Sequence, residues 1–337
     1  MRPRNRRSKV TERSHRERGM ALITVLLLVA VMGTVTAASL EIMNRSVAMA
    51  NNGRSAMQAR HHVRAMEHVA GRRLMALREQ YPDRLTLAGG WADTPILVPT
   101  EDGNVVLQLS DGSHCFNINA LVGPEQGGRR IIDPLGLEHF IGLARAVGID
   151  EQNARDLAFS ITDFIDSDMV PQAGGGEDEI YKDGEDSHRT ANTLLADPGE
   201  LAAVKGMTVE RLSRLRPHLC ALPSNDMVRI NVNTLQEEEA PLLAMLAPGQ
   251  LTLQQARRAI SARPEAGWES TDAFWDEPTL SALALPRGAS ESVDVKSDLF
   301  SINMMIDDAG FVSEANILFE VTKGRVRVVN RTWGTAS

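Results

Sequence analysis

The densest group of side chains that could do chemistry is an acidic segment over residues 163–186. Nine of its residues are Asp or Glu, and its only cation is Lys182. Carboxylate oxygens beside flexible glycines suit Ca²⁺, whereas Mg²⁺ sites with few protein ligands usually include substrate phosphates. The candidate metal ligands are the six acids around the glycines at 174–176, namely Asp163, Asp166, Asp168, Glu177, Asp178 and Glu179.

The spacing of these acids is a weak signal by itself. Asp166 and Asp168 have a D-x-D spacing, but the rest of the segment does not follow the calcium loop of an EF-hand. A solvated acidic loop without a metal explains the same residues equally well. From the residues alone, both interpretations therefore stay open.

Enzyme chemistry has little support in the sequence. The chain contains no H-E-x-x-H zinc motif, no G-x-S-x-G nucleophile turn and no G-x-x-x-x-G-K-[ST] phosphate loop. Paired carboxylates of the acidic segment leave a metal-dependent hydrolase as a remote alternative. The neighbours His61 and His62 are expected on the surface of a helix. No residue is therefore assigned a catalytic role, and the chain is not expected to be an enzyme.

The first eighty residues indicate on which side of a membrane the acidic segment lies. Residues 20–40 contain no charged side chain, and a helix of that length is about 30 Å long, close to the thickness of a bilayer core. Eight basic and two acidic residues lie within residues 1–18. The positive-inside rule then keeps the N-terminus cytoplasmic and exports the rest of the chain. A cleaved secretory signal peptide is the competitor, but its apolar core is normally shorter.

A single long helix is predicted over residues 20–80. No proline occurs between Met20 and Tyr81. Apolar residues then recur every three or four positions, which is the spacing of one helix face. We expect this face to cover a sheet of its own domain. It consists of Ala59, Val63, Met66, Ala70, Leu74 and Leu77.

The body after this helix is predicted to be α+β. Alternating apolar residues over 300–306 and 315–321, separated by turn residues, indicate an antiparallel sheet with one buried face. Residues 105–109 show a similar alternation. Between these strands lies a helical block, with helices expected near 137–147, 151–166, 198–205, 208–220, 235–247, 252–262 and 270–284.

The helical block contains a weak internal similarity. Residues 117–121 (NINAL) resemble residues 231–235 (NVNTL). The second copy, over residues 230–274, resembles a helix-hairpin-helix or SAM-like unit, and so do residues 200–219. Such units can bind DNA through a glycine-rich hairpin, so a membrane-anchored DNA receptor is the alternative function. Pro248 in the hairpin lacks an N–H donor, and three glutamates lie nearby at 237–239. A structural unit is therefore favoured.

The net charge and the cysteine content argue against several other classes of protein. The chain has 36 basic and 44 acidic residues, a net charge of -8, and only 4% aromatic residues, so it lacks the basic footprint of a nucleic-acid binder. Without residues 1–18 the remaining chain has 28 basic and 42 acidic residues, a net charge of -14. Two cysteines, Cys115 and Cys220, exclude a disulfide-rich scaffold and a four-cysteine zinc site.

The junction between the basic leader and the apolar run resembles a class-III prepilin signal. It reads Arg18-Gly19-Met20-Ala21-Leu22. The resemblance implies that a prepilin peptidase cuts between Gly19 and Met20 and that the new N-terminus is methylated. Most pilins carry Glu at the fifth mature position, which here is Thr24. A Glu in lipid needs a partner, which the resemblance identifies as the N-terminus of the preceding subunit. Thr24 needs none, which suits the first subunit of a filament.

Several blocks in order resemble the K-type minor pseudopilins of type II secretion. They are RGMALITVLLLVAV, CFNINAL at 115–121, DFIDSD followed by GGGEDEIY at 163–181, RTANTLLADPGELAAVKGM, the INVNT segment and the closing strands. The resemblance implies a subunit at the pseudopilus tip that primes assembly with I-type and J-type pseudopilins and helps to export folded proteins across the outer membrane. It implies a single-pass inner-membrane protein with a periplasmic body.

The same resemblance implies particular site properties and domains. It favours Ca²⁺ in the helical block near the acidic segment, and an oxidising periplasm favours a disulfide between Cys115 and Cys220. The expected domains are a cleaved leader (1–19), the N-terminal helix (20–80, membrane-spanning over 20–40), a pilin-like α/β domain (81–112 and 290–337) and an inserted helical domain (113–289).

Overall fold

The computed structural model describes residues 9–92, 94–101, 103–124, 129–182, 187–286, 288–308, 311–322 and 324–334. The first part of the expected leader, residues 1–8, lies outside the described residues, as do the acids Asp183, Glu185 and Asp186 of the acidic segment. The chain divides into two compact units, Met1–His61 and His62–Ser337.

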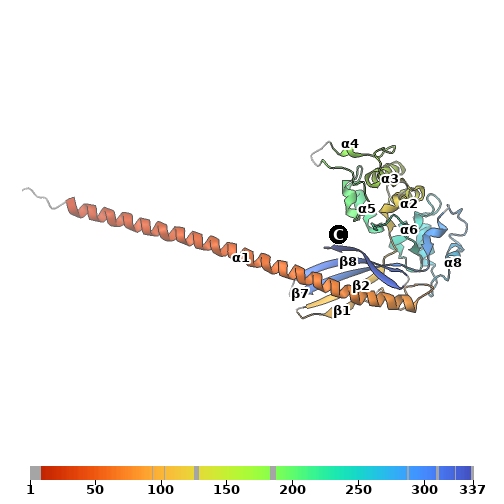
Figure 1. Cartoon of the computed structure of the whole chain (residues 1–337), viewed down its shortest axis with the longest axis horizontal. Coiled ribbons are helices and arrows are strands. Elements are labelled where there is room, and N and C mark those ends of the chain that lie inside the picture. The colour runs from red at the N-terminus through yellow and green to blue at the C-terminus, as the bar shows by residue number, and fades with distance from the viewer. Residues whose placement is uncertain are drawn as a thin grey trace, which may run out of the picture. The chain divides into compact units, whose positions relative to one another are not determined.

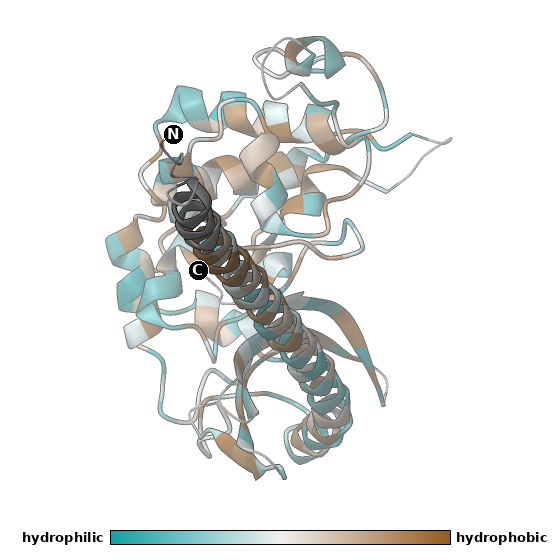
Figure 2. Ribbon diagram, turned by 90° about the vertical axis from the view of Figure 1, so that its left-hand side faces the viewer, coloured by the Kyte–Doolittle hydropathy of each residue, from teal (hydrophilic) through white to brown (hydrophobic). Residues whose placement is uncertain are grey.

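The first unit is helical throughout its described residues. Helix α1 (Lys9–Gln80) starts in it and continues into the second unit (Figure 1). The apolar stretch that begins at Met20 is long and hydrophobic enough to cross a membrane and is fully exposed in the structure. Figure 2 shows this stretch in brown. Its polar side chains bond to their own helix: Thr24 donates to the carbonyl of Met20 (2.6 Å) and Thr36 to that of Met32 (2.7 Å).

The second unit is built on a five-stranded antiparallel sheet in the order β1-β2-β7-β8-β9. Its strands are β1 (Ile96–Pro99), β2 (Gly103–Asp111), β7 (Leu299–Asp308), β8 (Phe311–Thr322) and β9 (Arg325–Trp333). Ile302, Ile317 and Phe319 are buried on the face that α1 covers. All six residues of the predicted α1 stripe are buried as well. The predicted α+β class with a long helix and an antiparallel sheet is therefore confirmed.

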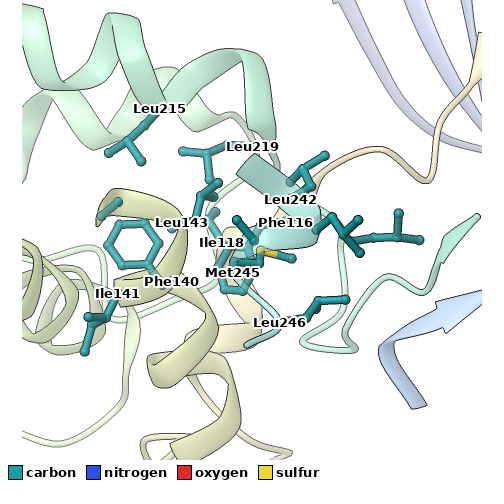
Figure 3. Packing of buried hydrophobic residues seen from close by; sticks show 14 of the residues in the cluster. Phe116, Ile118, Phe140, Ile141, Leu143, Leu215, Leu219, Leu242, Met245 and Leu246 are labelled. Carbon is teal, nitrogen blue, oxygen red and sulfur yellow. The ribbon is translucent and has the colours of Figure 1, made fainter. Parts of the chain in front are cut away.

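The chain between β2 and β7 forms the helical block. Its longer helices are α2 (Pro134–Ala146), α3 (Glu151–Ile165), α5 (Val209–Leu215), α6 (Ala240–Ala244), α7 (Leu253–Ser261) and α8 (Thr271–Trp275). Short elements are α4 (Asp178–Tyr181) and the 3₁₀ turns η1 (Ile118–Leu121), η2 (Pro198–Ala203), η3 (Arg216–His218), η4 (Glu237–Glu239) and η5 (Ser290–Ser292). Figure 3 shows how Phe140 and Leu143 of α2 pack near Leu242 and Met245.

Three helix predictions need correction. The helix expected over 270–284 ends at Trp275, before Pro278, because proline cannot continue the helical hydrogen bonding. The one expected over 208–220 ends at Leu215, because Pro217 directs the chain into η3 and then strand β4 (Leu219–Cys220). The segment expected as a helix over 198–205 is the 3₁₀ turn η2.

The helical block consists of two structural repeats. In each repeat a short strand at the start pairs in parallel with a short strand at the end. In the first, β3 (Phe116–Asn117) pairs in parallel with β4; in the second, β5 (Ile230–Asn231) pairs in parallel with β6 (Val293–Asp294). Each starts with an N-x-N segment whose amides fix distant loops. Asn119 donates to the carbonyls of Leu195 (2.9 Å) and Leu222 (2.7 Å), and Asn233 donates to that of Trp268 (3.0 Å). The internal similarity of the sequence thus corresponds to a structural repeat.

Candidate metal centre

Helix α3 delivers the first acids of the segment. Its N-cap Asp150 accepts a hydrogen bond from the backbone N–H of Asn153 (3.1 Å), and apolar residues such as Leu157 and Ile161 bury one face. The helix ends at Ile165 with Asp166 as its C-cap. The C-terminal end of a helix carries partial negative charge, which favours a cation and disfavours a carboxylate. An acid placed there therefore benefits from a bound cation.

Asp166, Asp168 and Glu177 come together as a cluster. One carboxylate oxygen of each lies within 4.8 Å of the corresponding oxygens of the other two. Asp166 is 2% exposed and Glu177 is 5% exposed. Among the residues that the structure describes, neither carboxylate oxygen of Glu177 has a hydrogen-bond partner. Because a buried carboxylate without donors is costly unless a cation compensates it, these residues fit a hard divalent cation such as Ca²⁺.

Two members of the cluster, Asp166 and Glu177, have raised pKa values. Burial raises the pKa of Asp166 to about 7, and the nearby charge of Asp168 adds to this shift. Burial likewise raises the pKa of Glu177 to about 7, with repulsion from Asp163 and Asp168 as the next causes. A divalent cation must displace these protons to bind, so its affinity is expected to depend on pH.

Asp163 holds the glycine loop in place. Its carboxylate accepts hydrogen bonds from the backbone N–H of Gln172 (3.0 Å) and Gly176 (2.8 Å). A Cβ atom at Gly175 would lie 2.0 Å from this carboxylate, so only glycine fits there. From the other side, the ammonium of Lys205 donates to the carbonyl oxygen of Gly175 (2.8 Å). The loop that brings Glu177 to Asp166 is thus fixed by backbone contacts.

The remaining two predicted ligands lie in different surroundings. Asp178 is buried, and its Oδ1 accepts from the backbone N–H (3.0 Å) and the hydroxyl (2.9 Å) of Thr190. These hydrogen bonds lower its pKa. Glu179 is exposed to solvent. Sequence reasoning missed Thr190 and Lys205, because both lie outside the acidic segment and only the fold brings their side chains into contact with it.

The two cysteines form a disulfide bond within the first repeat. Cys115 and Cys220 are 105 residues apart in sequence and 5.6 Å apart between Cα atoms. Cys115 directly precedes β3, and Cys220 is the last residue of β4, where it lies opposite Asn117. In the chain-entropy model, a cross-link over a loop of this length stabilises the fold by about 4–5 kcal/mol.

The hairpin that prompted the DNA-binding alternative uses its donors internally. The backbone N–H groups of Gln250 and Leu251 both donate to the carbonyl of Ala247, at 3.1 and 2.9 Å. Pro248 has no N–H group. The turn therefore lacks the row of free donors that would hold a phosphate.

Comparison with known proteins gives one consistent family. Models of the type II secretion system protein K family match residues 114–224 and 230–296. Protein K of Klebsiella pneumoniae is 33% identical over 267 residues, covering 79% of this chain and 81% of the relative. Protein K of Pectobacterium carotovorum is 29% identical over 320 residues, covering 95% and 97%.

A solved structure agrees with these sequence matches. A chain of the GspK–GspI–GspJ complex from enterotoxigenic Escherichia coli superimposes with a TM-score of 0.72 at 27% identity, covering 85% of this chain and 99% of that chain. None of these comparisons supports the DNA-receptor alternative. The two family matches coincide with the two repeats of the helical block. This chain belongs to the type II secretion system protein K family, as its sequence blocks predicted.

Proposed function

We propose that this protein is the minor pseudopilin at the tip of the type II secretion pseudopilus, where it primes assembly of the filament. The observation that carries the tip position is Thr24. Its hydroxyl is satisfied by the carbonyl of Met20 within its own helix. The apolar segment therefore presents no carboxylate that would need the N-terminus of a preceding subunit. The role is structural rather than enzymatic, in keeping with a family of secretion components.

The same proposal assigns topology and partners. The N-terminus is cytoplasmic, α1 crosses the inner membrane, and the body lies in the periplasm. Prepilin peptidase cleaves between Gly19 and Met20, and the new N-terminus is methylated. The I-type and J-type minor pseudopilins are the partners, supported by the similarity to a chain of the GspK–GspI–GspJ complex.

Processing is tested by Gly19→Val. The variant should accumulate as the uncleaved precursor in membranes, because the branched side chain blocks the peptidase. Ala30→Val, a change of similar size within the apolar run, is the control and should be processed normally. Mass spectrometry of the membrane-extracted protein measures the N-terminus. A mature N-terminus at Met20 in the Gly19→Val variant would contradict the assignment.

We also infer that Asp166, Asp168 and Glu177 hold Ca²⁺. When bound, the cation would neutralise the cluster and fix the acidic segment to the end of α3. Supporting features are the burial of Asp166 and the carboxylate of Glu177, which accepts no hydrogen bond from the described part of the chain. Asp163 accepts hydrogen bonds from the glycine loop and Asp178 accepts them from Thr190, and Glu179 is a matched acid outside the cluster.

Titration calorimetry and thermal melting test the calcium site. The full chain in detergent should release or absorb heat on addition of Ca²⁺, and a chelator should lower its Tm by several degrees. Glu177→Gln should weaken calcium binding at least tenfold, because it removes a charged ligand, whereas Glu179→Gln should bind as the wild type does. Equal affinities of the two variants, or no heat with the wild type, would contradict the site.

A further inference from the structure

His114 lies where the chain passes from the sheet into the helical block. Strand β2 ends at Asp111, and the chain returns to the sheet just after Ser297, at the start of β7. The hydroxyl of Ser297 donates to the carboxylate of Asp111, so the two connections meet at one acid. The side chain of His114 is 8% exposed and lies between this acid and the second repeat of the helical block.

The second repeat reaches the same place through its first residues. The hydroxyl of Thr234 donates to Oδ2 of Asp111 (2.6 Å). The side-chain amide of Asn231 donates to the hydroxyl of Ser297 (2.8 Å), and its backbone N–H donates to that of Ser113 (3.3 Å). All five residues are buried. One buried polar network therefore joins the second repeat to both connections with the sheet.

Both ring nitrogens of His114 face hydrogen-bond acceptors. Nδ1 lies 2.9 Å from Oε1 of Glu239, and a carboxylate only accepts hydrogen bonds. Nε2 lies 2.9 Å from the hydroxyl oxygen of Thr234. Because that hydroxyl donates its single proton to Asp111, it accepts from the ring. All these hydrogen bonds form together only when both nitrogens carry a proton, which makes His114 an imidazolium.

The two neighbouring acids stabilise this cation. Burial by itself lowers the pKa of His114, but the charge of Asp111 and then the hydrogen bond and charge of Glu239 outweigh it. Oδ2 of Asp111 is 3.8 Å from Nε2. The pKa of His114 is therefore raised above its ordinary value of 6.5, so the folded protein keeps this proton to higher pH than the unfolded chain does.

Further charged groups surround the network. Burial lowers the pKa values of His218 and Arg263, and the charge of Glu239 opposes both shifts. Asp197 and Arg216 line a cavity of about 600 Å³ that also reaches the imidazole. This cavity gives solvent protons a route to the buried ring.

We propose that His114 is a proton-dependent lock that joins the sheet to the second repeat. The doubly protonated ring donates to Glu239 and Thr234 and completes the network around Asp111. After it loses one proton, a ring nitrogen without hydrogen faces an acceptor, so a buried hydrogen bond is lost and the second repeat opens from the sheet more readily.

Proton linkage gives the direction of the effect. A group whose pKa is higher in the folded state contributes stability that is fully present below the unfolded pKa, here 6.5. That contribution is lost as the pH rises through the folded pKa. The lock is therefore tightest in mildly acidic solution and loosens in alkaline solution.

Hydrogen exchange of the full chain in detergent, read at single amides by mass spectrometry, tests the lock. The backbone N–H of Asn231 bonds across the join, whereas that of Leu195 bonds to the side chain of Asn119 within the first repeat (2.8 Å). After correction for the intrinsic effect of pH on exchange, protection at Asn231 should fall roughly tenfold or more between pH 6 and pH 9, while protection at Leu195 stays within about twofold. In His114→Gln, protection at Asn231 should be equally low at both pH values, because glutamine does not titrate.

A second variant moves the transition and leaves the histidine in place. Without the carboxylate of Glu239 the imidazolium is less stable, so Glu239→Gln should lower the pH midpoint of loosening at Asn231 by about one unit. Glu238→Gln changes an exposed neighbour and should keep the wild-type midpoint. His218→Gln should keep it as well, since the acids around His114 are unchanged. A purely structural role of Glu239 would not move the midpoint.

Three results would overturn the lock. The first is equal protection of Asn231 at pH 6 and pH 9 in the wild type. The second is an equal loss of protection at Asn231 and Leu195, which would mean that the whole body loosens rather than the join. The third is a common midpoint for Glu239→Gln and Glu238→Gln. This last comparison also decides the question if His114→Gln does not fold, because both variants retain the imidazole.

Discussion

His139 is an imidazole buried in the helical block, with 2% of its surface exposed. Its Nε2 has no hydrogen-bond partner within the described ranges of the chain. Burial lowers the pKa of His139 from 6.5 to about 4, with the charge of Asp133 opposing the shift. The unfolded chain therefore takes up a proton at higher pH than the folded protein does. Stability is present above the unfolded pKa and is lost as the pH falls from about 6.5 to about 4.

We predict that His139→Gln flattens this pH dependence. Between pH 7 and pH 5, the wild type should lose about 2 kcal/mol more free energy of unfolding than the variant does, because glutamine does not titrate. Urea denaturation at both pH values, in chelator, measures the difference. His68→Gln, at an exposed position of α1, should leave the wild-type slope unchanged. A variant as pH-sensitive as the wild type would show that His139 is not held neutral.

The acidic segment shows how far the sequence alone predicts the site. Composition indicated the segment in which the three clustered acids lie, because acids and glycines concentrate there. Composition could not distinguish the role of Asp166 from that of Asp163, since the roles differ only in the groups that each carboxylate contacts in the fold. Asp163 meets the backbone N–H groups of a loop that folds back from residues 172–176, whereas Asp166 meets Asp168 and Glu177. These contacts depend on loop closure, which leaves no spacing pattern in the sequence.

At the scale of elements, α2 approaches η1 through a glycine. A Cβ atom at Gly136 would lie 1.9 Å from the carbonyl oxygen of Ala120, which is backbone and cannot rotate away. We predict that Gly136→Ala destabilises the body by about 3 kcal/mol or more through overpacking, although alanine normally favours a helix. Gly123→Ala, whose Cβ would meet the carbonyl of Ile131 at 3.7 Å, should be nearly neutral. Equal stabilities in urea would contradict this packing.

The elements differ in how well the sequence predicts them. The long α1 and strands β7 and β8 follow from periodicity, because each buries one face over many residues. Strand β1 was missed, since it has only four residues, follows Pro95 directly and ends on Pro99. The length of α8 was overestimated because apolar residues continue beyond Pro278 in turns. The repeat was detected from its two N-x-N segments, but the parallel strand pairs that close each unit are too short for a pattern.

At the scale of the whole molecule, one part of α1 has the composition of a membrane span and another part belongs to the core of the second unit. The stretch of α1 that begins at Met20 is apolar and exposed, and the last part of the helix supplies buried residues to the second unit. We predict that a fragment of residues 62–337 folds in water without detergent and unfolds cooperatively, whereas the full chain partitions into membranes. Circular dichroism and flotation with lipid vesicles measure the two properties.

A shorter fragment of residues 81–337 is the matched control. It lacks Val63, Met66, Leu74 and Leu77, which are buried in the full chain. Each such side chain contributes about 1.5–3 kcal/mol when fully buried, and a domain has only about 5–15 kcal/mol of net stability. The shorter fragment should therefore aggregate or show no cooperative transition. If it melts at the same temperature as the longer one, the last turns of α1 are not part of the core, and the helix acts only as a membrane anchor.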